Sequence, residues 1–175
     1  LDATKAIANV IQPGNLVLLE STSPVGTTQK ISDVLQEYSG LNSEQFNIAY
    51  CPERVLPGRI LSELISNDRV IGGLTPTASD AAVVFYSKFC KGSFHVTSSR
   101  TAELVKLTEN ASRDVGIAFA NELSLICDKL DVNVGELIRL ANYHPRVNIL
   151  QPGCGVGGHC IPVDPYYMIQ RAADV

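Results

Sequence analysis

Residues 99–130 contain no proline and a single glycine, Gly116, and their apolar residues recur every three or four positions. This spacing predicts one α-helix of about 30 residues, which would be about 45 Å long. A helix of this length extends beyond one small domain, so we expect it to join domains or subunits. The positions that mark the helical period are Leu104, Leu107, Ala111, Val115, Ala118, Leu123 and Ile126.

Residues 1–97 show a different pattern, in which short apolar segments alternate with amphipathic ones. Strands joined by helices of this length predict a parallel sheet with helices on both faces. We therefore expect an α/β domain over residues 1–97 and an all-α domain over residues 98–175. The expected strands are residues 15–20, 46–50, 69–73 and 93–96, and the other expected helices are residues 26–38, 77–90, 134–142 and a last one from Pro162.

The composition excludes some classes of protein. The chain has 175 residues, 45% of them hydrophobic, and a formal net charge of −4. This charge argues against a general binder of nucleic acid, although a few well-placed arginines can still bind one small anion. No apolar run approaches the roughly 18–20 residues of a membrane span, so we expect no membrane segment.

Five cysteines, an odd number, occur without the layout of a secretory signal peptide. This predicts reduced thiols and a cytoplasmic protein. Cys154, His159 and Cys160 are close in sequence, but the paired spacing of a structural zinc site is missing, so we expect no metal. Cys127 is expected in the core. The chain starts inside a helical pattern without Met and stops without a turn signal, so we expect a piece of a longer protein.

Residues 152–165, Pro-Gly-Cys-Gly-Val-Gly-Gly-His-Cys-Ile-Pro-Val-Asp-Pro, carry the strongest indication of chemistry. Four glycines within six residues leave the backbone open to a ligand, and their amides can stabilise negative charge. Pro162 fits the first position of a helix, which would place Cys160 just before a helix N-terminus, where the dipole favours a thiolate. We interpret Cys160 as a covalent nucleophile, although a single cysteine is more often a small buried residue.

Two further motifs directly follow expected strands, where ligands bind in open parallel sheets. Residues 21–28, Ser-Thr-Ser-Pro-Val-Gly-Thr-Thr, offer hydroxyls and helix N-terminal amides to a cofactor, but the motif alone favours a plain helix cap. Residues 51–58 place Glu53 beside Arg54, a pair that can order water and bind an anion. A surface salt bridge explains that pair about equally well.

The long helix carries a set of polar residues three or four positions apart, which would share one face: Glu103, Lys106, Asn110 and Arg113. Lys106 and Asn110 could present an ammonium group and an amide to one reacting oxygen. A solvated polar face is the more common meaning of this spacing. Further along, His144 and Arg146 could reach a substrate or cap the end of a helix.

Four motifs follow one another along the chain: Ser-Thr-Ser-Pro-Val-Gly-Thr-Thr (21–28), Pro-Glu-Arg-Val-Leu-Pro-Gly (52–58), Lys-Leu-Thr-Glu-Asn (106–110) and Gly-Val-Gly-Gly-His-Cys-Ile-Pro-Val-Asp (155–164). In order and spacing they resemble the UDP-glucose/GDP-mannose dehydrogenase family, the nucleotide-sugar 6-dehydrogenases. Residues 67–73, 119–127 and 144–153 resemble the branch that oxidises UDP-N-acetyl-D-mannosamine. The resemblance implies NAD as cofactor and a Rossmann-like domain, of which residues 1–97 would be the rear part.

The resemblance also implies a four-electron oxidation, in which the C6 hydroxyl of the sugar becomes a carboxylate and two NAD molecules are reduced. Cys160 would attack the aldehyde to give a thiohemiacetal, and loss of hydride would give a thioester that water hydrolyses. Lys106 matches the family's catalytic lysine, and Asn110 would share its oxyanion. Asp164 matches the acid that supports the hydrolytic water, and Glu53 the acid of the Pro-Glu motif.

The other positions that match the family bind the cofactor, the substrate or a second subunit. Thr22 matches a threonine that contacts the cofactor. The long helix would form the core of a homodimer, and in this family an arginine near residues 144–146 can cross that interface. The sugar nucleotide would be held by Arg54, the Val55 backbone, Lys106, Asn110, Arg113, His144, Arg146 and Gly157.

Two departures from the family pattern limit these expectations. Pro57 stands where UDP-glucose enzymes carry a second glutamate, which favours an acetamido sugar as the substrate. The family's Gly-x-Gly-x-x-Gly fingerprint lies upstream of the position of Leu1, and its C-terminal UDP-binding domain is absent, so we expect little turnover from this chain alone. A stable, active 175-residue chain would contradict that expectation.

Three alternative functions remain open. The same chemistry on UDP-N-acetylglucosamine or UDP-glucose is hard to separate by sequence. A non-catalytic dimerisation fragment is disfavoured, because Cys160, Lys106, Asn110 and Asp164 are all present. A cysteine hydrolase is disfavoured because His159 adjoins Cys160, and neighbouring side chains in an extended loop point apart.

Overall fold

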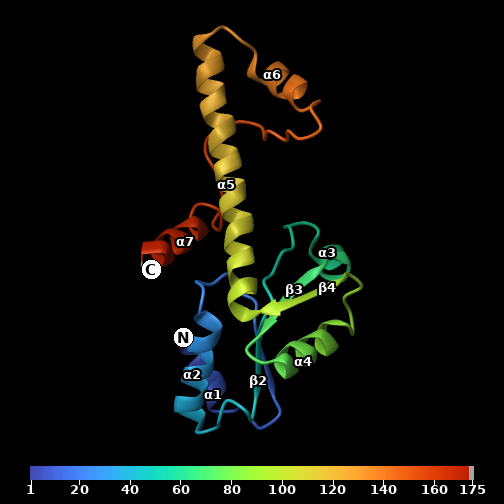
Figure 1. Cartoon of the computed structure of the whole chain (residues 1–175), viewed down its shortest axis with the longest axis vertical. Coiled ribbons are helices and arrows are strands. Elements are labelled where there is room, and N and C mark those ends of the chain that lie inside the picture. Colours follow the sequence, from blue (N-terminus) through green and yellow to red (C-terminus); the bar gives the residue numbers. More distant parts are fainter. Residues whose placement is uncertain (174–175) are drawn as a thin grey trace. The chain divides into compact units, whose positions relative to one another are not determined.

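The computed structural model describes residues 1–173, within which four strands and seven helices form (Figure 1). They divide into two compact units, Leu1–Lys106 and Leu107–Val175. In chain order the elements are α1 (Asp2–Ala8), β1 (Leu16–Leu19), α2 (Thr27–Ser39), β2 (Asn47–Tyr50), α3 (Ile60–Ser66), β3 (Arg69–Gly73), α4 (Pro76–Tyr86), β4 (Phe94–Ser98), α5 (Ser99–Lys129), α6 (Val134–Ala141) and α7 (Asp164–Ala173).

The expected α/β class is confirmed, and so is the long helix, since α5 runs for 31 residues. Most expected elements occur with ends that differ by a few residues, and only α3 was not expected. The last helix begins at Asp164 rather than at Pro162, because residues 161–163 form a turn in which the Cys160 carbonyl accepts from the Val163 and Asp164 amides. Cys160 therefore lies one turn before the helix N-terminus.

The sheet has the order β1-β2-β3-β4, but it is mixed rather than all parallel. β1 pairs with β2 in parallel, as does β3 with β4, whereas β2 and β3 are antiparallel. The reason lies between β2 and β3, where α3 has only seven residues and buries none of them. The Arg69 guanidinium, at the start of β3, donates to Cys51 Sγ at 3.8 Å, directly after β2. β3 therefore starts beside the end of β2 and runs in the opposite direction.

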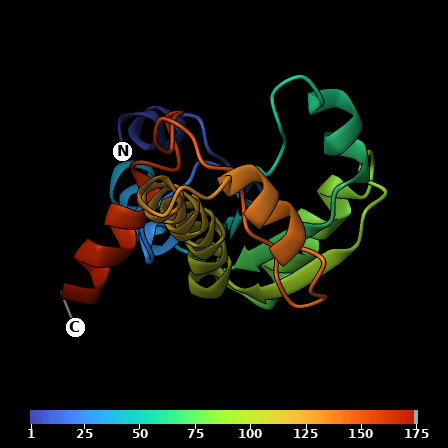
Figure 2. The ribbon, with the colours of Figure 1, turned by 90° about the horizontal axis from the view of Figure 1, so that it is seen from above.

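Helices cover both faces of this sheet, as expected (Figure 2). On one face α1 and α2 bury Ala8, Ile31 and Leu35 against Phe46 and Ile48. The other face packs against α4 through a second cluster, which contains Ala49, Cys51, Ile71, Ala82, Tyr86 and Cys90. Alternate residues of β1 and β2 enter opposite clusters, as the period of two requires.

α5 begins directly after β4 and packs tightly on β3. A Cβ atom added at Gly72 would lie 2.5 Å from the Ser98 carbonyl oxygen and 2.8 Å from the Ala102 Cβ. Only glycine fits this position without a shift of the backbone. Gly72 thus sets where the first turns of α5 lie on the sheet, and these turns carry Glu103 and Lys106.

The unit Leu107–Val175 contains the rest of α5, together with α6 and α7. Asn133 caps α6 by accepting from the Glu136 amide at 2.9 Å. Cys127, expected in the core, is buried. Of the expected apolar stripe of α5, however, Val115 and Ile126 are exposed. Although α5 is long, no helix within residues 1–173 is apolar enough over sufficient length to cross a membrane.

Candidate active site

The loop between β1 and α2 carries Thr22. Most of its polar groups are engaged within the unit Leu1–Lys106. Ser23 Oγ donates to the Ser21 carbonyl at 2.9 Å, and Thr27 Oγ1 donates to the Pro24 carbonyl at 2.6 Å. Within residues 1–173 the half-buried Thr22 hydroxyl makes no hydrogen bond, which leaves it free to meet a ligand.

The start of α2 is capped from a distant part of the chain. Glu103 of α5 is completely buried and accepts from the Gly26 amide at 2.6 Å, the Thr28 amide at 2.7 Å and the Thr28 hydroxyl at 2.7 Å. A carboxylate suits the positive end of a helix dipole. The Gly26 and Thr28 amides are therefore not available to a cofactor. The motif does not cap α2 with a side chain of its own, because Gly26 stands at the N-cap position and the acceptor is Glu103.

Thr22 follows β1 at the carboxyl end of a parallel strand pair, which is where ligands bind in sheets of this type. The hydroxyls of Ser21 and Thr22 make no hydrogen bond within residues 1–173, so they are the groups of this loop that remain available to a cofactor.

The Pro-Glu-Arg loop after β2 is held by Glu53 itself. Glu53 Oε1 accepts from the Arg54 amide at 2.6 Å and from the Val55 amide at 2.9 Å. The Glu53 amide donates to the Glu20 carbonyl at 3.2 Å, which joins this loop to the end of β1. A substrate contact at the Val55 backbone would therefore use its carbonyl oxygen or displace Glu53.

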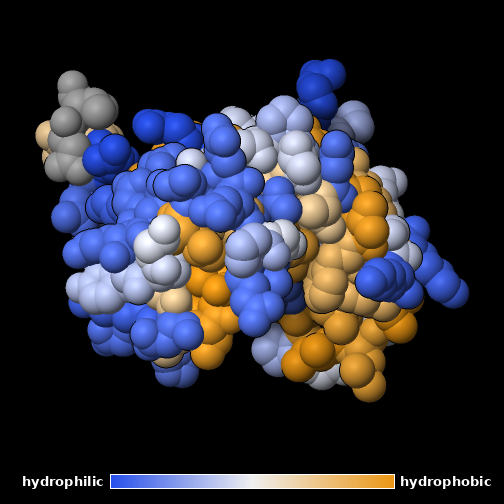
Figure 3. Space-filling model, turned by 90° about the horizontal axis from the view of Figure 1, so that it is seen from below, coloured by the Kyte–Doolittle hydropathy of each residue, from blue (hydrophilic) through white to orange (hydrophobic). Residues whose placement is uncertain are grey.

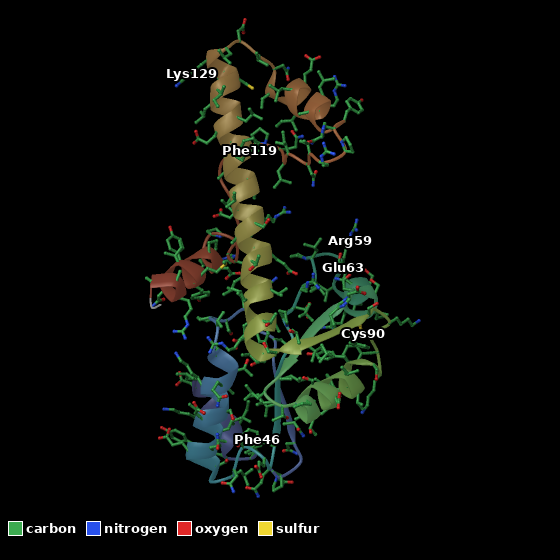
Figure 4. All side chains as sticks on the ribbon, viewed as in Figure 1. Phe46, Arg59, Glu63, Cys90, Phe119 and Lys129 are labelled. Carbon is green, nitrogen blue, oxygen red and sulfur yellow. The ribbon has the colours of Figure 1, made fainter. Side chains whose placement is uncertain are left out.

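Arg54 also contacts its own unit, since Nη1 donates to the Asp68 carbonyl at 3.4 Å. Further along, Glu63 Oε2 accepts from the Leu56 amide at 2.8 Å; Glu63 lies with Arg59 near the start of α3 (Figure 4). A hollow of about 10 Å³ borders Glu53 and Arg54, which is room for one water molecule at most. The hollow itself is therefore too small for a sugar, and a ligand of this loop would have to lie outside it.

A network of polar side chains, buried except for Glu20, lies next to the start of both loops. The Arg69 guanidinium lies 4.5 Å from the centre of the Tyr86 ring, and the Tyr86 hydroxyl donates to Glu20 Oε1 at 2.6 Å. Burial raises the pKa values of Tyr86 and Cys51, so both stay protonated at neutral pH. Because Glu20 precedes Ser21 and Cys51 precedes Pro52, this network positions the start of each loop.

Lys106 and Asn110 lie one turn apart on α5. Lys106 is half-buried and makes no hydrogen bond or ion pair within residues 1–173. Arg113 is exposed on the following turn. Glu103 does not share a solvated face with them, because it is buried under the β1–α2 loop. The expected polar face therefore starts at Lys106.

In the unit Leu107–Val175 the structure brings Asn110, Asp164 and Cys160 together. The Asn110 side-chain amide donates to Asp164 Oδ2, and Asp164 is only 4% exposed. The Asp164 amide donates to the Cys160 carbonyl at 2.9 Å, which holds the nucleophile candidate one turn before α7. The Cys160 side chain itself is exposed. Hydrogen bonds therefore link the Asn110 side-chain amide to the Asp164 carboxylate, and the Asp164 backbone to the residue that carries the Cys160 thiol.

The glycine-rich loop is open beside its backbone. Gly155, Gly157 and Gly158 have φ angles of 121°, 65° and 77°, which side chains rarely adopt. A Cβ atom added at any of them would meet no atom within 4 Å. The loop is tied at its start, where the Gly153 amide donates to Asn121 Oδ1 at 2.9 Å.

His144 and Arg146 are both exposed in the loop after α6, and they contact each other. The Arg146 amide donates to His144 Nδ1 at 3.3 Å, so the imidazole proton is assigned to Nε2 when the ring is neutral. Asn142 closes this loop by accepting from the Ile149 amide at 2.8 Å and donating to the Ile149 carbonyl at 3.0 Å. The two side chains thus stand on a closed loop, and the backbone of His144 closes the end of α6, since its amide donates to the Ala141 carbonyl at 3.0 Å.

The remaining cysteines are not part of the site. Cys51, Cys90 and Cys127 are buried, whereas Cys154 is exposed like Cys160, and all five are free thiols. Within the described residues, no group of three or more His, Cys, Asp or Glu side chains could hold a metal ion.

Sequence reasoning missed the residues that hold the site loops in place. Glu103 was grouped with the polar face of α5, and its position three residues before Lys106 gave no indication of burial. Asn121 and Asn142 are single amides whose partners lie 32 and 7 residues away. An asparagine directly after a helix is a weak signal for Asn142, and we find no local signal for the other two.

Two family models match this chain and together cover most of it. The NAD binding domain of the UDP-glucose/GDP-mannose dehydrogenase family matches residues 1–90, and the central domain of the same family matches residues 100–175. The fold, with its helix-covered sheet and long α5, agrees with these matches. The chain belongs to the UDP-glucose/GDP-mannose dehydrogenase family, and its cofactor is that of the matched domain, NAD.

Among its relatives, UDP-N-acetyl-D-mannosamine dehydrogenase of Campylobacter jejuni is 58% identical over 97% of this chain and 44% of the relative. NDP-N-acetyl-D-galactosaminuronic acid dehydrogenase of Ralstonia nicotianae is 57% identical over 98% of this chain and 43% of the relative. The solved UDP-D-ManNAc dehydrogenase of Pyrococcus horikoshii is 49% identical with a TM-score of 0.95, over 98% of this chain and 41% of that one. The chain therefore spans less than half the length of the relatives it matches.

Proposed function

We propose that the full-length protein containing this chain oxidises the C6 hydroxyl of UDP-N-acetyl-D-mannosamine to a carboxylate, with two NAD molecules reduced per sugar. The observation that carries the proposal is the connected set of Cys160, Asp164 and Asn110, which supplies a nucleophile, a base and an oxyanion donor. Membership of the dehydrogenase family and the similarity to UDP-N-acetyl-D-mannosamine dehydrogenases support the reaction class and the sugar.

The chain's own groups take the following parts. NAD, when bound, accepts a hydride from carbon 6 in each of two steps. Lys106 accepts the proton of the C6 hydroxyl in the first step and then stabilises the oxyanion together with Asn110. The Cys160 thiolate adds to the aldehyde carbon, and the resulting hemithioacetal loses its second hydride to become a thioester.

Water then releases the product. Asp164 accepts one proton from the attacking water, the C–S bond of the thioester breaks, and the Cys160 thiolate leaves as the sugar carboxylic acid forms and releases its remaining proton to solvent. Burial of Asp164 and its bond to Asn110 fix the carboxylate for this step. Glu53, whose loop borders a water-sized hollow, orders a second water near the site in this proposal.

The sugar nucleotide is held by Arg54, Arg113, His144 and Arg146, and its backbone contacts are to Val55 and Gly157. Three of these side chains are cationic at neutral pH and suit a diphosphate. Thr22 contacts the cofactor. The open space beside Gly157 lets a ligand approach the loop backbone closely.

We further propose a homodimer through α5. Three apolar side chains of α5 are exposed, Val115 at 68%, Phe119 at 56% and Ile126 at 52%. Their spacing of four and seven residues places them on one face of the helix. A second copy is the occupant that a self-complementary helix face suits, because two-fold symmetry pairs the same surface with itself. The protein is proposed to act in the cytoplasm, and its substrate to be a soluble UDP-sugar.

The NADH yield per sugar tests the proposal on the full-length protein. Two NADH per UDP-N-acetyl-D-mannosamine, with little from UDP-N-acetylglucosamine, UDP-N-acetylgalactosamine or UDP-glucose, is the expected result. The galactosamine sugar is included because relatives named for N-acetyl-D-galactosaminuronic acid are 57% and 58% identical to this chain. Two NADH from another sugar would retain the chemistry and change the substrate.

Cys160→Ser is the matched variant for the mechanism, with Cys154→Ser as its control on the same loop. We expect Cys160→Ser to abolish completed oxidation while sugar binding persists, because serine lacks a thiolate at neutral pH. Cys154→Ser should leave the yield at two NADH per sugar. A non-catalytic dimerisation protein would produce no NADH with or without either change.

A further inference from the structure

The carboxylate of Glu103 is the most completely engaged buried acid in the unit Leu1–Lys106. It is 0% exposed and accepts three hydrogen bonds, one from Gly26 at the end of the β1–α2 loop and two from Thr28 in the first turn of α2. Its two donor residues, Gly26 and Thr28, precede it by 77 and 75 positions in the sequence. Nothing in the proposed reaction uses this acid.

We propose that Glu103 is a positioning residue that locks the Ser21–Thr28 loop onto α5, so that Thr22 is presented to NAD beside the turn that carries Lys106. This inference rests on the proposed function above. Glu103 touches neither cofactor nor substrate in the proposal, and it acts through the loop.

The geometry of the loop supports this role. Gly26, whose amide donates to the carboxylate, has a φ angle of 97°, so a side chain here would be strained. Thr27 and Ser23 fasten the loop to its own carbonyls, at Pro24 and Ser21. With these bonds and the Glu103 clamp in place, the backbone on both sides of Thr22 is fixed, while its hydroxyl stays unused within residues 1–173.

Glu103 connects the loop to α5, because its own backbone is part of that helix. Lys106 follows Glu103 by three residues, so the two side chains leave neighbouring turns of one helix. The start of that helix is itself fixed on β3 by the close approach at Gly72. The loop, the start of α5 and β3 are therefore held together within the unit Leu1–Lys106. Loss of the Glu103 hydrogen bonds should release only the loop.

Glu103→Gln tests this arrangement in the full-length protein. Glutamine has nearly the same shape but offers one acceptor oxygen, and its NH₂ group would face an amide donor, so at least one of the three bonds is lost. Thr28→Val removes only the hydroxyl bond, and Thr28→Ser retains all three donors as the conservative rescue. Asp128→Asn, which also replaces a carboxylate by an amide at an exposed position of the same helix, is the matched control.

Hydrogen exchange and NAD binding without turnover are the measurements. We expect at least tenfold faster exchange of the residue 21–30 amides in Glu103→Gln, a smaller increase in Thr28→Val, and none in Thr28→Ser or Asp128→Asn. The Kd for NAD should rise at least tenfold in Glu103→Gln, while the Kd for the UDP-sugar stays within a factor of two.

Three outcomes would overturn the proposal. Faster exchange throughout residues 1–106, with both ligands weakened together, would show a general structural role. Faster exchange confined to the loop with unchanged NAD affinity would show that loop position does not matter for the cofactor. A wild-type protein that neither binds NAD nor produces NADH would refute the proposed function and this inference together, whereas wild-type activity with equal binding by Glu103→Gln refutes only the inference.

Discussion

The two units of this chain are built differently. Leu1–Lys106 holds both hydrophobic clusters and the buried polar network, and its loops are fastened by side chains from distant elements. Within residues 107–173, by contrast, the buried residues are Leu107, Ala120, Cys127, Ile138 and Asp164. Both units expose apolar side chains, but only the first has extended hydrophobic clusters of its own among the described residues.

This difference separates two tasks of the proposed enzyme. Thr22, Glu53 and Lys106 lie in the unit with a complete core, which suits groups that position ligands. Cys160 lies in an open glycine loop, where a nucleophile needs access and room to change its bonding. The exposed apolar face of α5 is the surface that the proposed homodimer would cover. We expect the effects of the following substitutions to decrease in size, and each one tests whether the two units differ in this way.

The largest effect is expected from Asp164→Asn in the open unit. Asparagine can still accept from Asn110, so the fold is retained, but it cannot take a proton from water. We expect the steady-state rate to fall by about 10²–10⁴, after an initial burst of about two NADH per active site, because the thioester accumulates. Stopped-flow absorbance measures both. Asp128→Asn, at an exposed position of α5, is the control, and a normal rate in Asp164→Asn would remove Asp164 from the mechanism.

The next effect concerns the core of the first unit. Leu35 is completely buried between α2 and the sheet, so Leu35→Ala should lower the free energy of unfolding by about 2–5 kcal/mol. Val34→Ala, at a half-buried neighbour on α2, should cost clearly less. Urea unfolding of the full-length protein measures the free energy lost in each variant. Hydrogen exchange of the α2 amides shows whether that loss is located in α2. Equal costs would mean that the first unit does not rely on its core in this way.

Much of this architecture could be predicted from the sequence, because helices and strands follow from local periodicity. The 31-residue α5 and the bounds of β3 were expected correctly. The antiparallel pairing of β2 with β3 was not, because it depends on α3 and on the contact between Arg69 and Cys51 across the chain. Strand direction is a property of long-range contacts, which residue spacing does not encode.

The candidate site shows the same limit. Motifs selected Lys106, Asn110, Cys160 and Asp164, and the structure joins the last three through hydrogen bonds. The spacing on α5 placed Glu103 on a solvated face, and the structure buries it. A carboxylate becomes buried only when donors far away in sequence gather around it, and here they come from the β1–α2 loop.

A third effect separates the surfaces of the two units. Phe119→Ser should weaken dimer formation by about 2 kcal/mol, a roughly thirtyfold rise in the dimer Kd, and leave the folded subunit intact. Val84→Ser is the matched change on α4, whose side of the molecule also shows an exposed apolar area (Figure 3). Analytical ultracentrifugation distinguishes them. Dissociation by Val84→Ser and not by Phe119→Ser would move the interface to the first unit.

A smaller effect is expected from the polar network of the first unit. Tyr86→Phe removes the hydroxyl that donates to Glu20 and keeps the ring that contacts Arg69. We expect the free energy of unfolding to fall by about 1 kcal/mol, because Glu20 is exposed and water can replace the lost donor. Phe85→Leu, on the exposed side of the same helix, is the control. A loss above about 3 kcal/mol would show that the network is a principal stabiliser of the unit.

The smallest effect is a dependence on pH at the surface of the first unit. The Ser93 amide and His95 donate to Asp68, and these bonds lower the pKa of its carboxyl group. Because the pKa is lower in the folded state, the stabilisation is present above the ordinary value near 3.8 and is lost as the pH falls through the folded value. Wild type should therefore melt slightly above Asp68→Asn at pH 7, and the two should converge in acid, whereas Asp80→Asn should show no such trend. A difference between wild type and Asp68→Asn that stays constant down to acid would assign the effect to the shape of the side chain and not to its charge.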